Sequence, residues 1–193
     1  MKMIALYALT ALGSACASPE VGPYQVPEAT QRDTTRAEAL TREAEDLMEA
    51  EPDAAEILLR EALTADLFHG PAHNNLGVLF LKGGKLYEAA HEFEWARKLL
   101  PGHPDPRVNL ALVLEAAGKV DEALAAYDAA LEVSSDYLPA MMGAASLTVR
   151  AGRNDSRIGE WLDGIVLRSG DPTWQGWARA QRLRLRPGLP RDR

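Results

Sequence analysis

Apolar side chains recur every three or four residues along most of the chain between residues 36 and 186. This is the spacing of one face of an α-helix. Residues typical of turns and helix ends interrupt the pattern, as at Gly83-Gly84 and at Asp171-Pro172. The pattern predicts an all-α chain of about nine helices joined by short connections.

Individual helix bounds can be predicted at both ends of this region. The expected helices there are 36–50, 53–66, 138–151, 156–167 and 172–186. Asp53 is predicted to cap the second of them, and Asn154-Asp155-Ser156 supplies turn and cap chemistry before the fourth. Asp171 followed by Pro172 is typical of a helix start, because proline suits the first helical position.

The helical pattern repeats every 34 residues, and small or aromatic side chains return in five columns. The columns are Gly77, Ala111 and Ala145; Gly84, Gly118 and Gly152; Ala55, Ala89 and Ala123; Leu59, Phe93, Tyr127 and Trp161; and Ala62, Ala96, Ala130 and Gly164. A fixed period of this length indicates helix pairs that bury their apolar faces against one another.

Packing explains the residue types in these columns. Small residues such as Gly77 and Ala89 are expected where the two helices of a pair approach most closely. The aromatic rings of Phe93 and Tyr127 are expected to fill the space between one pair and the next. Gly84 is expected to adopt a left-handed conformation where a first helix ends.

Two segments resemble the tetratricopeptide repeat. Residues 70–103 carry His73 where that family favours Trp, followed by Leu76-Gly77, Phe80, Ala89, Phe93, Ala96 and Pro101. Residues 104–137 repeat the pattern with Leu110-Ala111, Leu114, Ala123, Tyr127 and Ala130. The resemblance implies a right-handed superhelical solenoid of antiparallel helix pairs. Its implied parts are repeats 36–69, 70–103, 104–137 and 138–171, a capping helix 172–186 and a tail 187–193.

The first residues have the layout of a secretory signal. Lys2 precedes an uncharged run from residue 3 to residue 12, which is too short to span a bilayer. The sequence Leu12-Gly13-Ser14-Ala15-Cys16 resembles the lipobox of bacterial lipoproteins, which implies a signal over 1–15 and a lipid on Cys16. Two alternatives are cleavage after Ala17, which releases a soluble chain, and an uncleaved buried helix. The proline-rich segment 16–35 is predicted to be a disordered tether.

Charge and residue inventory exclude several classes of function. The net charge of −7 argues against a nucleic-acid-binding domain. A single cysteine allows neither a disulfide within the chain nor a cysteine-ligated zinc site. His91 and Glu92 begin like a zinc-protease motif, but Trp95 stands where the second histidine is required. We therefore expect no enzyme, metal site, cofactor or small-molecule substrate.

All four histidines are predicted to lie on the surface or in loops. They are His69, His73, His91 and His103. His69 and His73 are four residues apart, but Gly70-Pro71 between them is expected to prevent a shared helix face.

The geometry of the resembled family predicts a partner-binding groove lined by the first helix of each pair. Its residues are Asn74, Val78, Leu81, Lys82, Val108, Asn109, Leu112, Glu115, Met142, Ser146, Val149 and Arg150. The family's carboxylate clamp is not expected, because Asn74 stands where its first lysine would be. A mixed apolar groove instead suits a helix or extended segment of another protein. Alternatively, part of this apolar set simply packs against neighbouring helices.

These features together predict a non-catalytic interaction scaffold. The expected place is the periplasmic side of a bacterial outer membrane, held by the lipid on Cys16. Resemblance to tetratricopeptide lipoproteins suggests assembly of a pilus, secretion or cell-wall complex. The alternative is a soluble periplasmic or secreted binding module.

The two ends of the repeat region carry opposite charge. Residues 37–66 contain ten acidic and two basic residues, whereas residues 172–193 contain six arginines and one aspartate. Head-to-tail association of copies, attraction to anionic lipid and two simply solvated faces are all compatible with this pattern.

Overall fold

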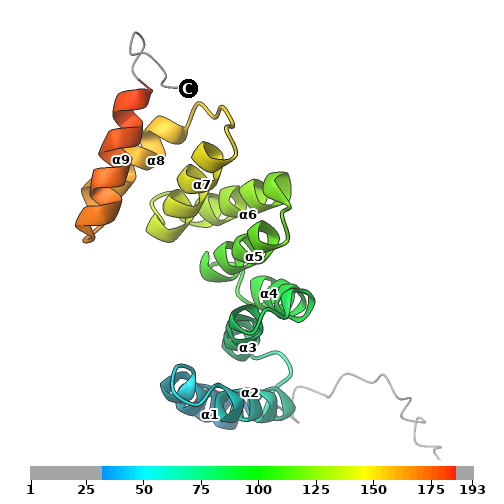
Figure 1. The fold of residues 1–193 in the computed structure, drawn as a ribbon. Helices are drawn as coiled ribbons and strands as arrows, with labels where there is room; N and C mark the ends of the chain where they lie inside the picture. Colours follow the sequence, from blue (N-terminus) through cyan, green and yellow to red (C-terminus); the bar gives the residue numbers. More distant parts are fainter. Residues whose placement is uncertain (1–31, 186–193) are drawn as a thin grey trace, which may run out of the picture. The chain divides into compact units, whose positions relative to one another are not determined.

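The computed structural model describes residues 32–185, and these residues form nine α-helices and no strand (Figure 1). The helices are α1 (Thr34–Leu47), α2 (Pro52–Ala65), α3 (Gly70–Lys82), α4 (Leu86–Leu99), α5 (Asp105–Ala116), α6 (Val120–Val133), α7 (Leu138–Arg150), α8 (Ile158–Arg168) and α9 (Pro172–Arg184). The all-α prediction is confirmed.

Consecutive helices contact one another in chain order from α1 to α9, which makes residues 32–185 a helical-repeat solenoid. The first helices of the pairs also touch in turn, α1 with α3, α3 with α5 and α5 with α7. Within the described part of the chain, no two of the second helices α2, α4, α6 and α8 are in contact. The first helices therefore share one continuous face. The right hand of the superhelix stays a prediction.

The repeated small residues pack where their spacing predicts. The ring of Phe93 faces Gly77 of its own helix pair, and the ring of Tyr127 faces Gly143 of the next pair. The side chains of Phe93 and Tyr127 are fully buried, as are the alanines Ala89 and Ala123 of the same helices. A Cβ placed on Gly77 would lie 2.7 Å from the ring of Phe93, so α3 and α4 can approach this closely only with glycine there.

The buried apolar residues divide into two clusters. One is built from α1 to α4 and reaches Val113 on α5. The other extends from α5 to α9 and includes Val108, Tyr127 and Trp161. Helix α5 therefore contributes to both clusters.

Three turns close the first helices in the same way. Gly84, Gly118 and Gly152 have φ of 72°, 74° and 63°, a left-handed conformation that glycine adopts without strain. After Gly84, the amide of Lys85 donates to the carbonyl of Phe80 at 2.8 Å, and the same bond recurs 34 and 68 residues later. This bond satisfies a carbonyl that the end of the helix leaves free. The predicted cap at Gly84 is confirmed.

The folded region begins earlier than predicted. Helix α1 starts at Thr34 rather than residue 36, because the carboxylate of Asp33 accepts a hydrogen bond from the backbone amide of Arg36 at 2.9 Å. Arg32 reaches back to Asp66 at the end of α2, with Nε 2.7 Å from Oδ1 and Nη2 2.9 Å from Oδ2. The predicted tether boundary at residue 35 is therefore wrong, since residues 32–35 are part of the folded unit.

The Arg32 guanidinium also sets the ionisation of Asp66. Its hydrogen bonds hold the pKa of the Asp66 carboxyl below the usual range, and they outweigh the opposing effect of burial. Because this pKa is lowered in the folded state, the ionised pair stabilises the fold above the ordinary carboxyl pKa near 4 and is lost as the pH falls below it.

Other helix ends differ from prediction by up to one turn. Helix α1 ends at Leu47 rather than residue 50, and α2 begins at Pro52, so Asp53 lies in its first turn instead of capping it. Helix α8 begins at Ile158 rather than residue 156, because Asp155 folds back to accept the amide of Arg157. Asp171 caps α9 as predicted and accepts the amide of Thr173 at 2.7 Å.

Several predictions lie outside the described residues. They concern the signal 1–15, Cys16, the tether up to residue 31, Arg186 and the tail 187–193. Among residues 32–185, no helix is long and apolar enough to cross a membrane.

Candidate functional site

The first helices α1, α3, α5 and α7 form a face that we call the first-helix face. Eleven of the twelve residues predicted to line a groove lie on these helices with partly or fully exposed side chains. The exception is Val108, which is 7% exposed and belongs to the core cluster shared with α6 and α7. Its assignment to the groove is therefore wrong, because its side chain packs inside the protein.

Side-chain amides run across three of the first helices as a chain of hydrogen bonds. Nδ2 of Asn109 on α5 donates to Oδ1 of Asn74 on α3 at 3.0 Å, and Asn74 donates to Asn75 at a longer 3.4 Å. Asn75 then donates to Oε1 of Glu45 on α1 at 2.8 Å. Each side-chain amide keeps a second N–H. This row of amides therefore offers hydrogen-bond donors to a ligand that lies across the helices.

Charged residues on the first-helix face are paired with each other. Lys82 on α3 pairs with Glu49 in the turn after α1, and Arg150 on α7 pairs with Glu115 on α5. The predicted groove cations therefore each have an acidic partner one repeat earlier. Neither of these two cations is left without an acidic partner on the described surface.

Glu115 also anchors the face to the core. It accepts the hydroxyl of Tyr127, whose ring is buried between helices. Burial, with the nearby carboxylate, raises the pKa of Tyr127, so this hydroxyl stays a donor.

The apolar residues of the first-helix face are unequally exposed. Leu112 on α5 is 42% exposed and belongs to neither core cluster. Val78 and Leu81 pack in part against one cluster, and Met142 and Val149 against the other. Part of the predicted set therefore packs against neighbouring helices, which leaves Leu112 as its most exposed apolar side chain.

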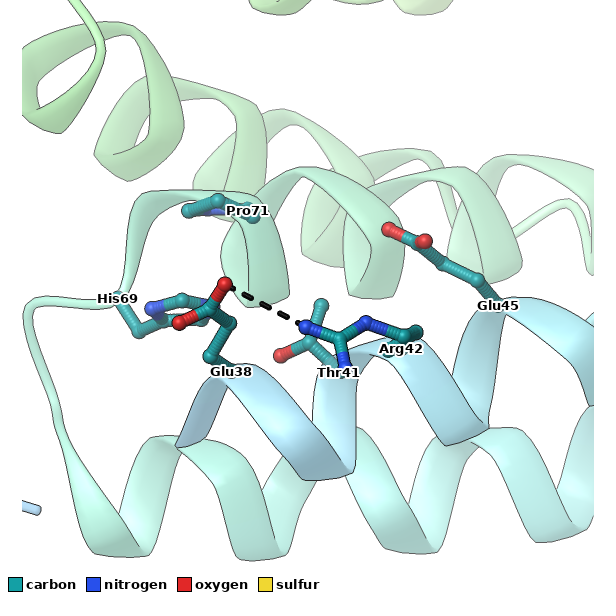
Figure 2. A pocket seen from close by; sticks show the side chains of 6 residues that line it. All are labelled: Glu38, Thr41, Arg42, Glu45, His69 and Pro71. Carbon is teal, nitrogen blue, oxygen red and sulfur yellow. Dashed lines mark hydrogen bonds and ion pairs between the residues drawn. The ribbon is translucent and has the colours of Figure 1, made fainter. Parts of the chain in front are cut away.

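A shallow hollow of about 280 Å³ lies on α1 and the start of α3, and none of the residues predicted to line the groove is among its lining residues (Figure 2). Its lining residues are Glu38, Thr41, Arg42, Glu45, His69 and Pro71. Figure 2 shows Arg42 reaching Glu38, at 3.4 Å. Burial lowers the pKa of His69 despite the opposing charges of Asp66 and Glu38. Nε2 of His69 has no hydrogen-bond partner in the described region.

His73 is buried rather than exposed, which corrects the prediction for this residue. Its Nδ1 lies 2.6 Å from Oε2 of Glu92 on α4, and its Nε2 lies 2.9 Å from the carbonyl of Leu67. Its ring also stacks on Trp95. These contacts give His73 a structural role in joining α3 to α4 and to the preceding loop. His91 and His103 are exposed, as predicted.

Among residues 32–185, no group of His, Asp or Glu side chains could hold a metal ion. The arrangement on the first-helix face offers hydrogen-bond donors, paired charges and one exposed leucine. Such a surface can bind another polypeptide through its backbone and one apolar side chain.

This fold defines a class, the helical-repeat solenoids, and comparison with known families gives the family. The tetratricopeptide repeat family matches residues 74–139 and 108–172, which together span about half of the chain. The chain belongs to the tetratricopeptide repeat family, whose fold is typical of protein–protein interaction scaffolds. No protein with a curated description matches the sequence significantly.

Solved structures share the fold at low sequence identity. The O-GlcNAc transferase of Thermobaculum terrenum is 25% identical with a TM-score of 0.62, over 77% of this chain but only 27% of that enzyme. The first repeat domain of Spaghetti (RPAP3), bound to the HSP90 peptide SRMEEVD, is 16% identical with a TM-score of 0.59, over 63% of this chain and 98% of that one. Pseudomonas aeruginosa pilF is 21% identical with a TM-score of 0.57, over 81% and 79%.

Proposed function

We propose that this protein is a non-catalytic scaffold that binds an extended segment or helix of a partner protein on its first-helix face. The chain of amides from Asn109 to Glu45 is the observation that carries the proposal. Amide N–H groups that remain free on Asn74 and Asn109 suit the carbonyls of a bound backbone. The peptide-bound Spaghetti (RPAP3) domain supports this proposal by its shared fold.

Leu112 supplies the apolar contact of the proposed site. It lies one helical turn from Asn109 on α5, so a partner that contacts the amides also reaches the leucine. Burying a leucine side chain is worth about 1.5 to 3 kcal/mol. An apolar side chain of the partner that packs against Leu112 would therefore strengthen binding about tenfold or more.

A photoactivatable amino acid at position 112 is expected to cross-link a defined partner protein in the native cell, where the same amino acid at Tyr87 does not. Tyr87 is 84% exposed on α4, a second helix, and so provides the matched control. Once the cross-linked segment of the partner is identified, calorimetry measures its binding to the protein. Leu112→Glu should weaken this binding at least tenfold, and Tyr87→Glu should leave it unchanged. Cross-linking of the same segment from both positions, or from position 87 alone, would contradict the site.

We propose further that a lipid on Cys16 holds the scaffold at the periplasmic side of a bacterial outer membrane, where it assists assembly of a pilus, secretion or cell-wall complex. The signal-like run over 3–12, the small residues before Cys16 and the use of cysteine nowhere else support this. Stable anchoring needs more than one acyl chain, since a single chain binds membranes only weakly.

Cys16→Ala is expected to move the protein from the membrane fraction to the soluble fraction while its helix content stays the same. Cell fractionation with immunoblotting and mass spectrometry of the mature N-terminus measure the two effects. A wild-type protein that is soluble and begins at Ser18 would show the alternative, a released binding module cut after Ala17.

A further inference from the structure

The ring of His73 has a hydrogen-bond acceptor beside each of its two nitrogens. Nδ1 lies 2.6 Å from Oε2 of Glu92 on α4, and Nε2 lies 2.9 Å from the backbone carbonyl of Leu67. A carbonyl and an ionised carboxylate only accept hydrogen bonds, and a neutral imidazole carries a single N–H. A neutral ring beside an ionised Glu92 would therefore place one ring lone pair against an acceptor. Both contacts are hydrogen bonds only if one additional proton is present.

The additional proton has two places to lie, the ring of His73 or the carboxyl group of Glu92. An imidazole holds a proton more strongly than a carboxylate does, since the two ordinarily lose it near about pH 6.5 and about pH 4.3. The proton therefore lies on the ring, which donates from both nitrogens. An imidazolium bonded to a carboxylate is a charge-assisted hydrogen bond, which is stronger than one between neutral groups.

Burial makes both hydrogen bonds important to the packing. The side chain of His73 is 5% exposed and that of Glu92 is 15% exposed. The His73 ring also stacks on Trp95, with 5.8 Å between the ring centroids. Little water reaches the ring, so a hydrogen bond lost here is not replaced by one to solvent.

Other charged or titratable side chains lie on the two elements that contact the ring. On α4, the ammonium group of Lys98 lies 5.6 Å from the centroid of the Trp95 ring. In the loop before α3, the carboxylate of Asp66 already has an arginine partner. Burial lowers the pKa of His69 in the same loop, so this second histidine is neutral at about pH 7. Glu92 is thus the anion that bonds the ring and retains its second proton.

We propose that His73 is a pH-sensitive clamp, which ties the loop before α3 to α4 while its ring carries two protons and releases one of these contacts when it loses one. The folded protein retains the second proton through Glu92, whereas an unfolded chain loses it near about pH 6.5. The stabilisation is therefore complete below about pH 6.5 and is lost as the pH rises and the folded protein gives up the proton. The sign is opposite to that of the pair between Arg32 and Asp66, which is lost in acid.

The clamp adjoins the first-helix face. Asn74 follows His73 in the chain, and its side chain accepts the hydrogen bond from Asn109 on α5. Release of α3 from the loop or from α4 should therefore also disturb the row of side-chain amides in the proposed binding site. This consequence rests on the proposed function, whereas the clamp itself can be tested on the protein without a partner.

The protons on the His73 ring can be observed by NMR of the ring nitrogens in the full chain with Cys16→Ala, in which position 16 cannot carry a lipid. At about pH 7.5, we expect both nitrogens of His73 to be protonated. About nine in ten of the exposed rings of His91 and His103 should hold a single proton at that pH. A His73 ring with one protonated nitrogen under these conditions would overturn the proposal.

Glu92→Gln tests the clamp while it preserves the shape of the site. The amide of glutamine can donate to Nδ1, so a neutral ring satisfies both contacts without a second proton. The His73 ring of this variant should therefore hold a single proton at about pH 7.5. Glu88→Gln is the matched control, since it removes a carboxylate from an exposed position of the same helix. Its His73 ring should keep both protons.

Urea unfolding measures what the loss of the proton does to stability. The unfolding midpoint of the wild type and of Glu88→Gln should fall between about pH 6.5 and about pH 8.5, and the fall in Glu92→Gln should be at most about half as large. His69 does not contribute in this range, because a histidine whose pKa is lowered by folding destabilises the fold only on the acid side of about pH 6.5. A wild-type midpoint that does not fall, or equal falls in the wild type and Glu92→Gln, would refute the clamp.

Discussion

Replacement of Tyr127 by alanine is expected to lower the free energy of unfolding by about 3 to 5 kcal/mol, the usual cost of removing a buried aromatic side chain. Tyr127 is the largest fully buried side chain among residues 32–185, and it belongs to the core cluster formed by α5 to α9. The substitution leaves a cavity that the surrounding helices fill only in part. It also removes the hydroxyl that Glu115 accepts.

Urea titration followed by circular dichroism measures this change, and Tyr87→Ala is the matched control. Tyr87 is 84% exposed on the preceding second helix, so its loss should change the free energy of unfolding by no more than about 0.5 kcal/mol. Equal unfolding midpoints for the two variants would show that Tyr127 is not buried in the core and that the repeat register is wrong.

A single added methyl group at Gly143 is expected to destabilise the protein by about 1 to 3 kcal/mol. A Cβ at this position would lie 2.3 Å from ring atoms of Tyr127, so α7 would have to move away from α6. The clash outweighs the better helix propensity of alanine, which favours the substitution by about 1 kcal/mol.

Gly176→Ala provides the opposite expectation on a helix with open space. Apart from the chain neighbours and the backbone of α9 itself, no described atom lies within 4 Å of a Cβ built there. Only the propensity gain therefore applies, and stability should rise by about 0.5 to 1 kcal/mol. Thermal unfolding of both variants gives the comparison. If Gly143→Ala also raised the midpoint, the close contact between α6 and α7 would not exist in solution.

The repeat register could be predicted from the sequence because packing restricts the same positions in every helix pair. A residue facing a ring at close range must be small, which places Gly77 opposite Phe93, and the chain reversal requires glycine at Gly84. These restrictions recur every 34 residues, so they are visible without any structure. The all-α fold and the order of its helix pairs follow from them.

The details of the site could not be predicted in the same way, because they depend on side chains from different helices. The amide chain joins Asn75 to Glu45 and Asn74 to Asn109 across helices, and no spacing rule marks Asn75. His73 is buried because Glu92 lies opposite it on α4. The one available signal for His73 was its place in the repeat, where the tetratricopeptide family has a large aromatic residue.

The start of the fold was missed for a related reason. Arg32 and Asp66 are 34 residues apart, and their ion pair forms because α2 runs back along α1 and ends beside the start of α1. Helical periodicity describes the apolar face of a helix and says nothing about a polar residue that precedes it. A boundary drawn from periodicity alone therefore falls too late in the chain.

The division of the core between two clusters bears on how the folded chain opens. Val108 and Val113 lie fewer than two turns apart on α5 but pack in different clusters, so we expect that one half can lose its packing while the other half keeps its own. Local opening of this kind costs less free energy than global unfolding. A segment bound across α3, α5 and α7 would contact both halves, so partner binding would join two cooperative units into one.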